Sequence, residues 1–113
     1  MRLLPHLLFV ALLWLGLALG AHAADDMQTF EVIAHDGRLL PENLEVPAGI
    51  KLKLALKNQG RTPVEFENLD LRVEKVLAPG AASFVVIHPL RPGTYRFVDE
   101  FHPATGEMLI IAK

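Results

Sequence analysis

The amino-acid sequence predicts an all-β domain, a sandwich of about seven strands. Apolar and polar residues alternate with a period of two in several short runs, which is the pattern of strands that bury one face. Breakers rich in proline and glycine separate these runs at intervals of roughly 8–14 residues, a spacing typical of sandwiches and barrels. After the first 23 residues, no run has the period of an amphipathic helix.

The first strand is predicted at 30–35, where Phe30, Val32 and Ala34 supply the apolar face. The second and clearest strand, 50–57, follows a Pro-Ala-Gly breaker and alternates isoleucine or leucine with lysine or alanine. An Asn-Gln-Gly breaker ends it. Both runs predict strands whose apolar side chains face a shared core.

Two further strands are predicted in the middle of the chain. At 65–67, extended backbone places Glu65 and Glu67 on one face and Phe66 on the other. At 69–74, leucine and valine alternate with charged residues, which predicts the next strand. Ala-Pro-Gly and Arg-Pro-Gly breakers then separate three more alternating runs, which predict strands at 83–88, 94–98 and 108–112.

The first 23 residues predict a secretory signal peptide. Arg2 gives a short basic start, residues 7–19 are almost unbroken apolar sequence, and Ala21-His22-Ala23 is a small-residue cleavage pattern. The apolar run is shorter than the about 20 residues that a membrane-spanning helix needs, so a retained anchor is the less favoured alternative. We therefore expect residues 24–113 to form one small periplasmic domain with no stable membrane anchor.

The composition excludes several classes of function. The chain has no cysteine, which removes type-1 copper, iron–sulfur and cysteine-nucleophile chemistry. The balance of 11 Lys and Arg against 13 Asp and Glu gives a net charge of −2 at pH 7, which argues against nucleic acid as a partner. Ser83 is the only serine and has no nucleophile-elbow glycines beside it, so a hydrolase triad is not predicted.

The segment YRFVDEFHPATGEM, residues 95–108, combines several potential metal ligands. Asp99, Glu100 and His102 follow the penultimate predicted strand, and Met108 begins the last one. A proline after His102 favours extended backbone there, and the next residues turn the chain back, so Met108 can approach the imidazole. The alternative for this histidine is a solvated loop residue.

Glu65 and Glu67 form a second group of potential ligands. Carboxylates that lie close together raise each other's pKa unless a cation compensates, and a metal ion is the expected cation. The alternative is a solvated polar face with Phe66 in the core. If a metal site exists, we expect the side chains of Glu65, Asp99 and His102 to converge within about 5 Å. Weaker candidates are His35, expected in a surface turn, His88, expected to end a strand before Pro89, and Glu74, a surface charge or an outer carboxylate.

Three stretches of the chain carry a family resemblance. PENLEVPAGIKLKLALKNQG has a proline, a VPAG turn and an apolar strand that ends in asparagine, and PVEFEN and VEKVLAPG follow it. PLRPGTYRFVDEFHPATGEMLIIA is similar to the GTYxFxC…H…M ending of copper-binding cupredoxins. The chain resembles the cupredoxin family, specifically the small periplasmic cupredoxin-like proteins of bacterial iron uptake, of the EfeO and Ftr type. This resemblance implies a cupredoxin-like Greek-key β-sandwich.

The sequence departs from the copper-binding members where the resemblance implies metal ligands. Glu65 aligns with their first histidine, Asp99 with the cysteine, His102 with the second histidine and Met108 with the methionine. Carboxylates in place of a thiolate and an imidazole favour iron, manganese or a tetragonal Cu(II) over type-1 copper. The implied metal ligands are Glu65, Asp99 and His102, with Glu67, Glu100 and Met108 as further candidates.

The resemblance implies a periplasmic metal-binding protein that serves high-affinity iron uptake. It would bind iron or Cu(II) beside an inner-membrane iron permease and a periplasmic iron-binding protein, and assist Fe(II) oxidation more as an accessory than as an enzyme. One alternative is a non-enzymatic copper carrier that uses His102, Met108, and His35 or His88. Another is a metal-free β-sandwich that acts through protein contacts.

Overall fold

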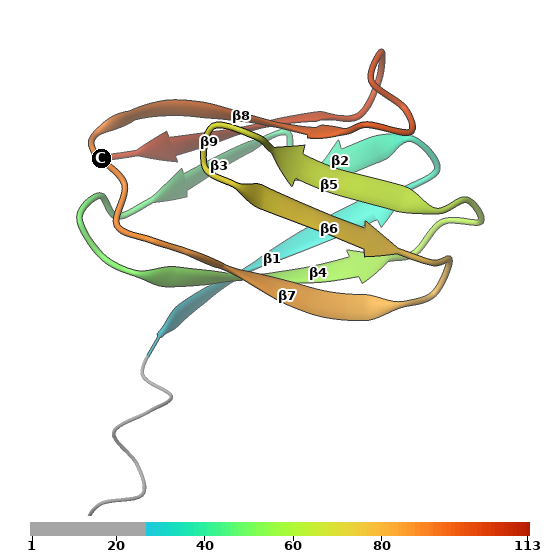
Figure 1. Ribbon diagram of the computed structural model, residues 1–113, viewed down its shortest axis with the longest axis horizontal. Helices are drawn as coiled ribbons and strands as arrows, with labels where there is room; N and C mark the ends of the chain where they lie inside the picture. Colours follow the sequence, from blue (N-terminus) through green and yellow to red (C-terminus); the bar gives the residue numbers. More distant parts are fainter. Residues whose placement is uncertain (1–26) are drawn as a thin grey trace, which may run out of the picture.

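The computed structural model describes residues 27–113, in which every regular element is a β-strand (Figure 1). The signal peptide predicted at 1–23 lies outside the described residues. Within the described range, no helix is long and apolar enough to cross a membrane. The strands are β1 (Gln28–His35), β2 (Arg38–Leu40), β3 (Asn43–Val46), β4 (Leu52–Asn58), β5 (Val64–Asn68), β6 (Val73–Leu77), β7 (Ala82–Ile87), β8 (Gly93–Asp99) and β9 (Glu107–Ala112).

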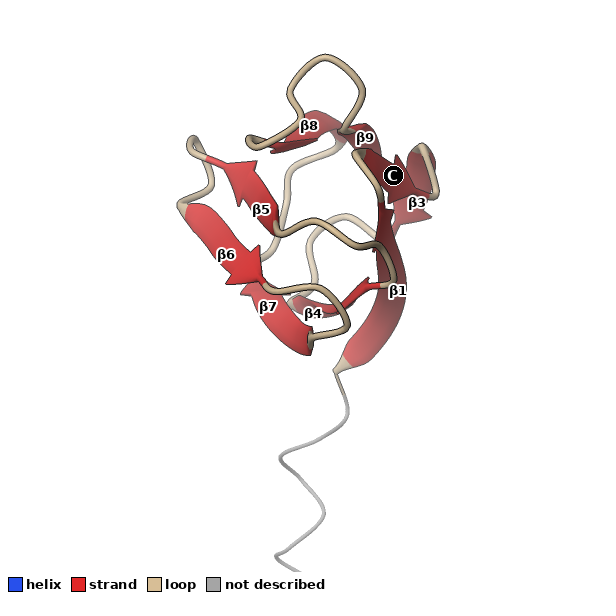
Figure 2. Cartoon of the chain, turned by 90° about the vertical axis from the view of Figure 1, so that its right-hand side faces the viewer, coloured by secondary structure: helices blue, strands red, loops and turns tan. Residues whose placement is uncertain are grey.

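Two sheets pack as the β-sandwich that the sequence predicts. One sheet has the strand order β2-β1-β4-β7 and the other has the order β3-β9-β8-β5-β6. The pairs β1–β4 and β3–β9 are parallel, and all other neighbours within the sheets are antiparallel. Figure 2 shows β6 and β7 side by side where the two sheets meet. The all-β class is confirmed, with nine strands in residues 27–113 instead of about seven.

The two strands that the sequence did not predict are short and lie at sheet edges. β2 has three residues and β3 has four, so a period-two pattern has too little length to stand out in either. Each pairs with a neighbour on one side only, β2 with β1 and β3 with β9. Their pairing with longer strands, and not their own sequence pattern, makes them strands.

The strand predicted at 69–74 is wrong, because residues 69–72 form a turn and β6 begins at Val73. The Asn68 side chain accepts a hydrogen bond from the backbone N–H of Leu71 at 2.9 Å, a local bond that competes with strand pairing. Arg72 then takes a left-handed conformation, with φ of +56°. Leu69 is 70% exposed, so its place in the alternating run does not mark a buried face.

The core lies between the two sheets and is built from alternate residues of the predicted strands. The leucines Leu52, Leu54 and Leu56 of β4 are at most 4% exposed, which confirms the predicted alternation from Leu52 onward. The prediction is wrong at its first residue, because Ile50 precedes β4 and is 42% exposed. Phe66 and Phe97 stack with their ring centroids 5.1 Å apart and join β5 to β8 inside the sandwich. Apolar packing therefore holds the domain together without a disulfide.

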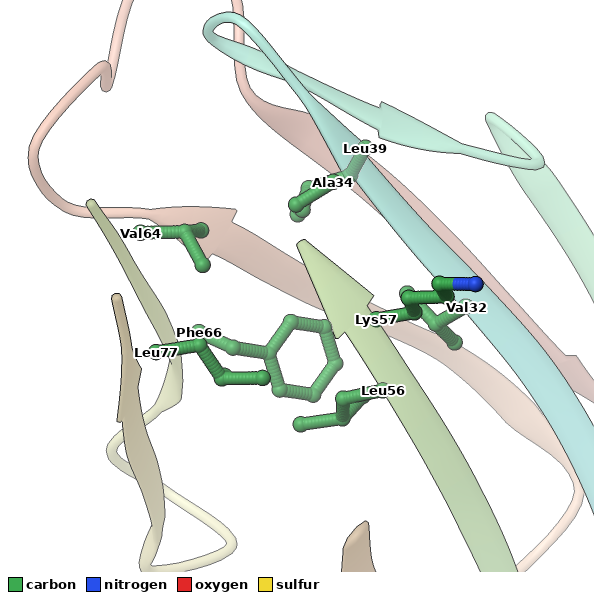
Figure 3. Close-up of a pocket in the computed structure, with 8 residues that line it drawn as sticks. All are labelled: Val32, Ala34, Leu39, Leu56, Lys57, Val64, Phe66 and Leu77. Carbon is green, nitrogen blue, oxygen red and sulfur yellow. The ribbon is translucent and has the colours of Figure 1, made fainter. Parts of the chain in front are cut away.

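A small apolar cavity of about 10 Å³ lies in the core beside Phe66 (Figure 3). Side chains that include Val32, Leu56 and Leu77 line it. Its volume is about that of one water-sized probe, whereas small-molecule sites occupy upwards of about 300 Å³. This cavity is therefore a packing gap and not a ligand site.

Candidate metal centre

Three glutamates meet on the outer face of the five-stranded sheet. Phe66 of β5 points into the core, so Glu65 and Glu67 on either side of it point away from the core. The antiparallel register of β5 and β6 pairs Glu67 with Glu74. One carboxylate oxygen from each of Glu65, Glu67 and Glu74 lies within 4.8 Å of the others. We call these three residues the glutamate cluster.

Glu67 is the buried member of the glutamate cluster, with only 7% of its surface exposed. Burial, a hydrogen bond with Glu65 and the charges of Glu100, Glu65 and Glu74 together raise the pKa of its carboxyl to about 7, with burial the largest cause. None of the ion pairs in residues 27–113 involves any of these four glutamates. The cluster therefore lacks a cationic partner from the described part of the chain.

Glu67 can be reached from solvent through a surface groove. Arg96, Val98 and Glu100 are among the residues that line this groove with Glu67. The guanidinium of Arg96 is held by Glu107, with Nε 2.6 Å from Oε2, and so does not neutralise the cluster.

Asp99 lies at the end of β8, on the inner side of the same sheet, and is 2% exposed. Its Oδ1 accepts hydrogen bonds from the backbone N–H of Glu65 at 3.1 Å and of Phe101 at 3.0 Å. Its Oδ2 lies 2.8 Å from Nδ1 of His102. The carboxylate is buried with three hydrogen-bond partners, which is how proteins make such burial tolerable.

The β8–β9 loop, residues 100–106, folds back over Asp99 and projects beyond the strands (Figure 1). The imidazole of His102 rests on Gly37 of the β1–β2 turn, where an added Cβ would lie 3.2 Å from ring atom Cδ2. Gly106 packs more closely still on Asp99, because a Cβ there would lie 2.7 Å from the Asp99 Cβ. Close approach requires glycine at position 106, and the left-handed backbone of Gly37, with φ of +85°, favours glycine there.

The structure divides the predicted metal ligands between two places and the core. Glu65 and Glu67 belong to the glutamate cluster, and the charge of Glu100 acts on it. Asp99 and His102 contact each other, but within residues 27–113 they do not form a three-ligand group with the Glu65 carboxylate. Met108 is completely buried in the hydrophobic core, on the inward face of β9 that it shares with Ile110 and Ala112.

Glu74 is the cluster member that sequence reasoning ranked too low. The wrong strand at 69–74 hid the signal, because it left no turn between β5 and β6. Once 69–72 is recognised as a turn after Asn68, residues 67 and 74 stand opposite each other in the hairpin. An Asx-turn residue between two short acidic runs was therefore the available clue.

The two weaker histidine candidates both lie at the surface, as predicted for His35. His35 ends β1 exposed, with its Nδ1 3.8 Å from Asp36 Oδ2. His88 is exposed directly after β7. Neither belongs to a group of three potential ligands within the described part of the chain.

The donor atoms of the glutamate cluster determine which metal ions it can bind. It offers only carboxylate oxygens, and the sequence has no thiolate to build a type-1 copper centre. Hard oxygen donors suit iron, manganese, magnesium or calcium ions better than Cu(I). The residues present therefore fit a hard cation and do not fit a blue copper site.

Comparisons with known proteins agree with the fold. The model of the cupredoxin-like domain family matches residues 7–111 of this chain. The uncharacterized protein RP394 of Rickettsia prowazekii is 32% identical over 87 residues, covering 77% of this chain and 70% of that protein. Auracyanin B shares the fold with a TM-score of 0.63 at 18% identity, over 76% of this chain and 88% of that one.

A solved metal-binding domain has the same fold. It belongs to the Cu(I)-exporting P-type ATPase CopA of Streptococcus pneumoniae D39 and was solved with Cu(I). It superposes with a TM-score of 0.68 at 10% identity, over 79% of this chain and 88% of that chain. The match of the family model to almost the whole chain and the relative at 32% identity carry the assignment. This chain belongs to the cupredoxin-like domain family.

Proposed function

We propose that this protein is a periplasmic metal-binding accessory protein of iron uptake, and that the glutamate cluster holds its cargo ion. One observation carries the proposal: Glu67 is buried among carboxylates, with its pKa raised and no cationic partner in residues 27–113. A bound cation would compensate this repulsion between carboxylates and would therefore stabilise the folded protein.

The type of ion follows from the donors. Glu65, Glu67 and Glu74 would hold it through oxygen, which is the ligand that hard cations prefer. Copper relatives share the fold, as the CopA domain solved with Cu(I) does, but a soft ion would find no sulfur ligand in the cluster. The donor chemistry therefore favours iron or manganese over a copper carrier function.

The residues also bear on the redox state of iron. Anionic oxygen donors stabilise Fe(III) over Fe(II), so an iron ion in the glutamate cluster would be easier to oxidise than in water. The protein's own contribution is to hold three carboxylates together and to leave Glu67 accessible through the groove beside Val98. An inner-membrane iron permease and a periplasmic iron-binding protein are the proposed partners, on the strength of the family resemblance.

Calorimetric titration tests the cluster. Purified protein is titrated with Mn(II), with Fe(II) under anaerobic conditions and with Cu(II), beside Glu67→Gln and the matched control Glu31→Gln, which changes an exposed glutamate on the other sheet. We expect one Mn(II) or Fe(II) per chain, with affinity lowered at least about tenfold in Glu67→Gln and unchanged in Glu31→Gln. Equal binding by both variants, or none by the unmodified protein, would disprove the cluster as a cargo site.

The role in iron uptake needs a separate measurement. A strain that lacks the gene should grow slowly in iron-limited medium, and the intact gene should restore growth whereas Glu67→Gln should not. Oxygen uptake on addition of Fe(II) to the protein then distinguishes assisted oxidation from simple binding. Normal growth of the deletion strain in iron-limited medium would disprove the role in iron uptake, but it would not disprove metal binding by the glutamate cluster.

A further inference from the structure

We infer that Asp99 is a positioning residue and not a metal ligand, and that it holds His102 so that the ring nitrogen Nε2 faces outward with a free lone pair. The inference concerns the loop end of the sandwich and does not require the glutamate cluster to bind metal. It can therefore stand or fall separately from the proposed function.

The hydrogen bonds of Asp99 leave its carboxylate little capacity for an ion. Oδ1 already accepts two backbone N–H groups, from Glu65 and Phe101, and Oδ2 is engaged by His102. The residue is 2% exposed, and Gly106 closes over its Cβ. An ion that bound Asp99 would have to displace these donors and leave at least one of them buried without a partner.

The same bonds decide which nitrogen of His102 carries hydrogen. A carboxylate only accepts hydrogen bonds, so Nδ1, at 2.8 Å from Oδ2, must be the donor. In a neutral imidazole one nitrogen donates and the other accepts, so Nε2 keeps its lone pair. Nε2 has no hydrogen-bond partner among the side chains and backbone of residues 27–113.

The loop around His102 is held from several sides. The backbone N–H of His102 donates to the Asp99 carbonyl at 2.9 Å, and the His102 carbonyl accepts from the backbone N–H of Gly106 at 2.8 Å. One ring edge lies against Gly37, and the Thr105 hydroxyl donates to the Gly37 carbonyl at 2.6 Å, which ties the loop to the β1–β2 turn. The side chain of His102 is nevertheless 31% exposed, and no buried side-chain nitrogen in residues 27–113 lacks a hydrogen-bond partner, so the unpartnered Nε2 is accessible to solvent.

This arrangement makes His102 a prepared nitrogen ligand. A carboxylate that accepts one ring N–H fixes the tautomer of a histidine and increases the basicity of the other nitrogen. Imidazole nitrogen suits borderline divalent ions, of which Cu(II) binds most strongly. The glutamate cluster offers hard oxygen donors, so His102 and the cluster differ in the ions that they prefer.

The tautomer of His102 is measured directly by ¹⁵N nuclear magnetic resonance of the unmodified protein at about pH 8.5, above the ordinary imidazole pKa of about 6.5. We expect hydrogen on Nδ1 and none on Nε2. The isosteric variant Asp99→Asn should reverse this, because its amide nitrogen donates to Nδ1 while its oxygen still accepts from both backbone groups. The outward nitrogen then carries hydrogen, with the number of hydrogen bonds unchanged.

Metal titration supplies the second readout. In Asp99→Asn, the Cu(II) affinity that depends on His102 should fall about 10–100-fold, with loss of the nitrogen coupling in the electron paramagnetic resonance spectrum. His102→Ala should lose the same signal, and adding Asp99→Asn to it should change nothing further. Mn(II), as a probe of the glutamate cluster, should bind Asp99→Asn within about twofold of the unmodified protein.

Three results would overturn the inference. The first is a hydrogen on Nε2 in the unmodified protein, a measurement that does not depend on whether Asp99→Asn folds. The second is equal His102-dependent Cu(II) affinity in the variant and the unmodified protein. The third is loss of Mn(II) binding in a folded Asp99→Asn, which would make Asp99 a ligand. Absence of Mn(II) binding in the unmodified protein would count against the proposed function alone.

Discussion

At the residue scale, two buried carboxylates in one sheet have opposite surroundings. Asp99 is met by three hydrogen-bond donors, which stabilise its negative charge inside the protein. Glu67 is met by Glu65 and Glu74, which oppose its charge. The first carboxylate is satisfied by the chain itself, and the second is the one that a cation would stabilise. This contrast is the reason to look for metal at Glu67 and for positioning at Asp99.

The raised pKa of Glu67 predicts how stability depends on pH. Burial and the neighbouring glutamates raise the pKa from the ordinary 4.5 to about 7 in the folded protein, so between these values the folded state binds more protons than the unfolded state. Its contribution is fully present below about pH 4.5 and is lost as pH rises through about 7, so the free energy of unfolding should fall over this window.

Urea denaturation at half-unit steps from pH 4 to pH 8, in the presence of a chelator, measures this dependence. Glu67→Gln should remove the decline, because the amide does not ionise, whereas Glu31→Gln on the other sheet should retain it. Mn(II) added at pH 8 should restore stability to the unmodified protein and to Glu31→Gln, but not to Glu67→Gln. A decline that persists in Glu67→Gln would assign it to another group.

At the element scale, the loop between β4 and β5 depends on one buried asparagine. Asn58 is 1% exposed, and its amide nitrogen donates to the carbonyls of Thr62 at 2.8 Å and Leu77 at 3.2 Å. Its side-chain oxygen accepts from the backbone N–H of Gly60 at 3.0 Å. One side chain therefore shapes the loop, connects it to β6 and sets where β5 begins.

Asn58→Ala should lower the free energy of unfolding by about 2 kcal/mol, because it leaves the buried Leu77 carbonyl without a partner. The matched control is Gln59→Ala, which changes the exposed next residue, whose side chain makes no hydrogen bond in residues 27–113. Guanidinium denaturation followed by fluorescence measures both variants. Equal stability of Asn58→Ala and the control would show that the loop is held by other contacts.

At the scale of the whole molecule, stability rests on apolar packing between two sheets. The chain has no cysteine, and a domain of this size buries only about 60–65% of the surface that its unfolded chain exposes. The core is nevertheless continuous, with Leu54 and Phe97 completely buried and Phe66 nearly so. Individual core residues should therefore contribute a large share of the total stability.

Leu54→Ala should lower the free energy of unfolding by about 3 kcal/mol, since it removes a fully buried side chain from the centre of β4 and leaves a cavity. Leu69→Ala is the matched control: Leu69 is 70% exposed in the turn before β6, and its loss should change stability by less than about 0.5 kcal/mol. Thermal unfolding of both variants decides the matter. Similar transition temperatures would contradict a core centred on β4.

The alternation was sufficient to predict the buried residues in the middle of β1 and β4, because the two-residue period of a strand is a local property. It failed at Ile50, which precedes β4 and is 42% exposed. It was not sufficient at 69–74, where the Asn68 side chain bonds the backbone of Leu71 and turns the chain. Of the candidate ligands, the contact of Asp99 with His102 follows from three residues of separation. The meeting of Glu67 with Glu74 required the hairpin register.

The sequence by itself determined the all-β class, the inward leucines of β4, and the absence of a thiolate site. Only the tertiary structure decided that Glu74 joins Glu65 and Glu67 on their face while Asp99 and His102 face the loop end of the sandwich. The physical reason is that side-chain alternation and ligand chemistry are local. Which carboxylates meet is set by the pairing of strands across turns, and a shift of one residue would move them to opposite faces.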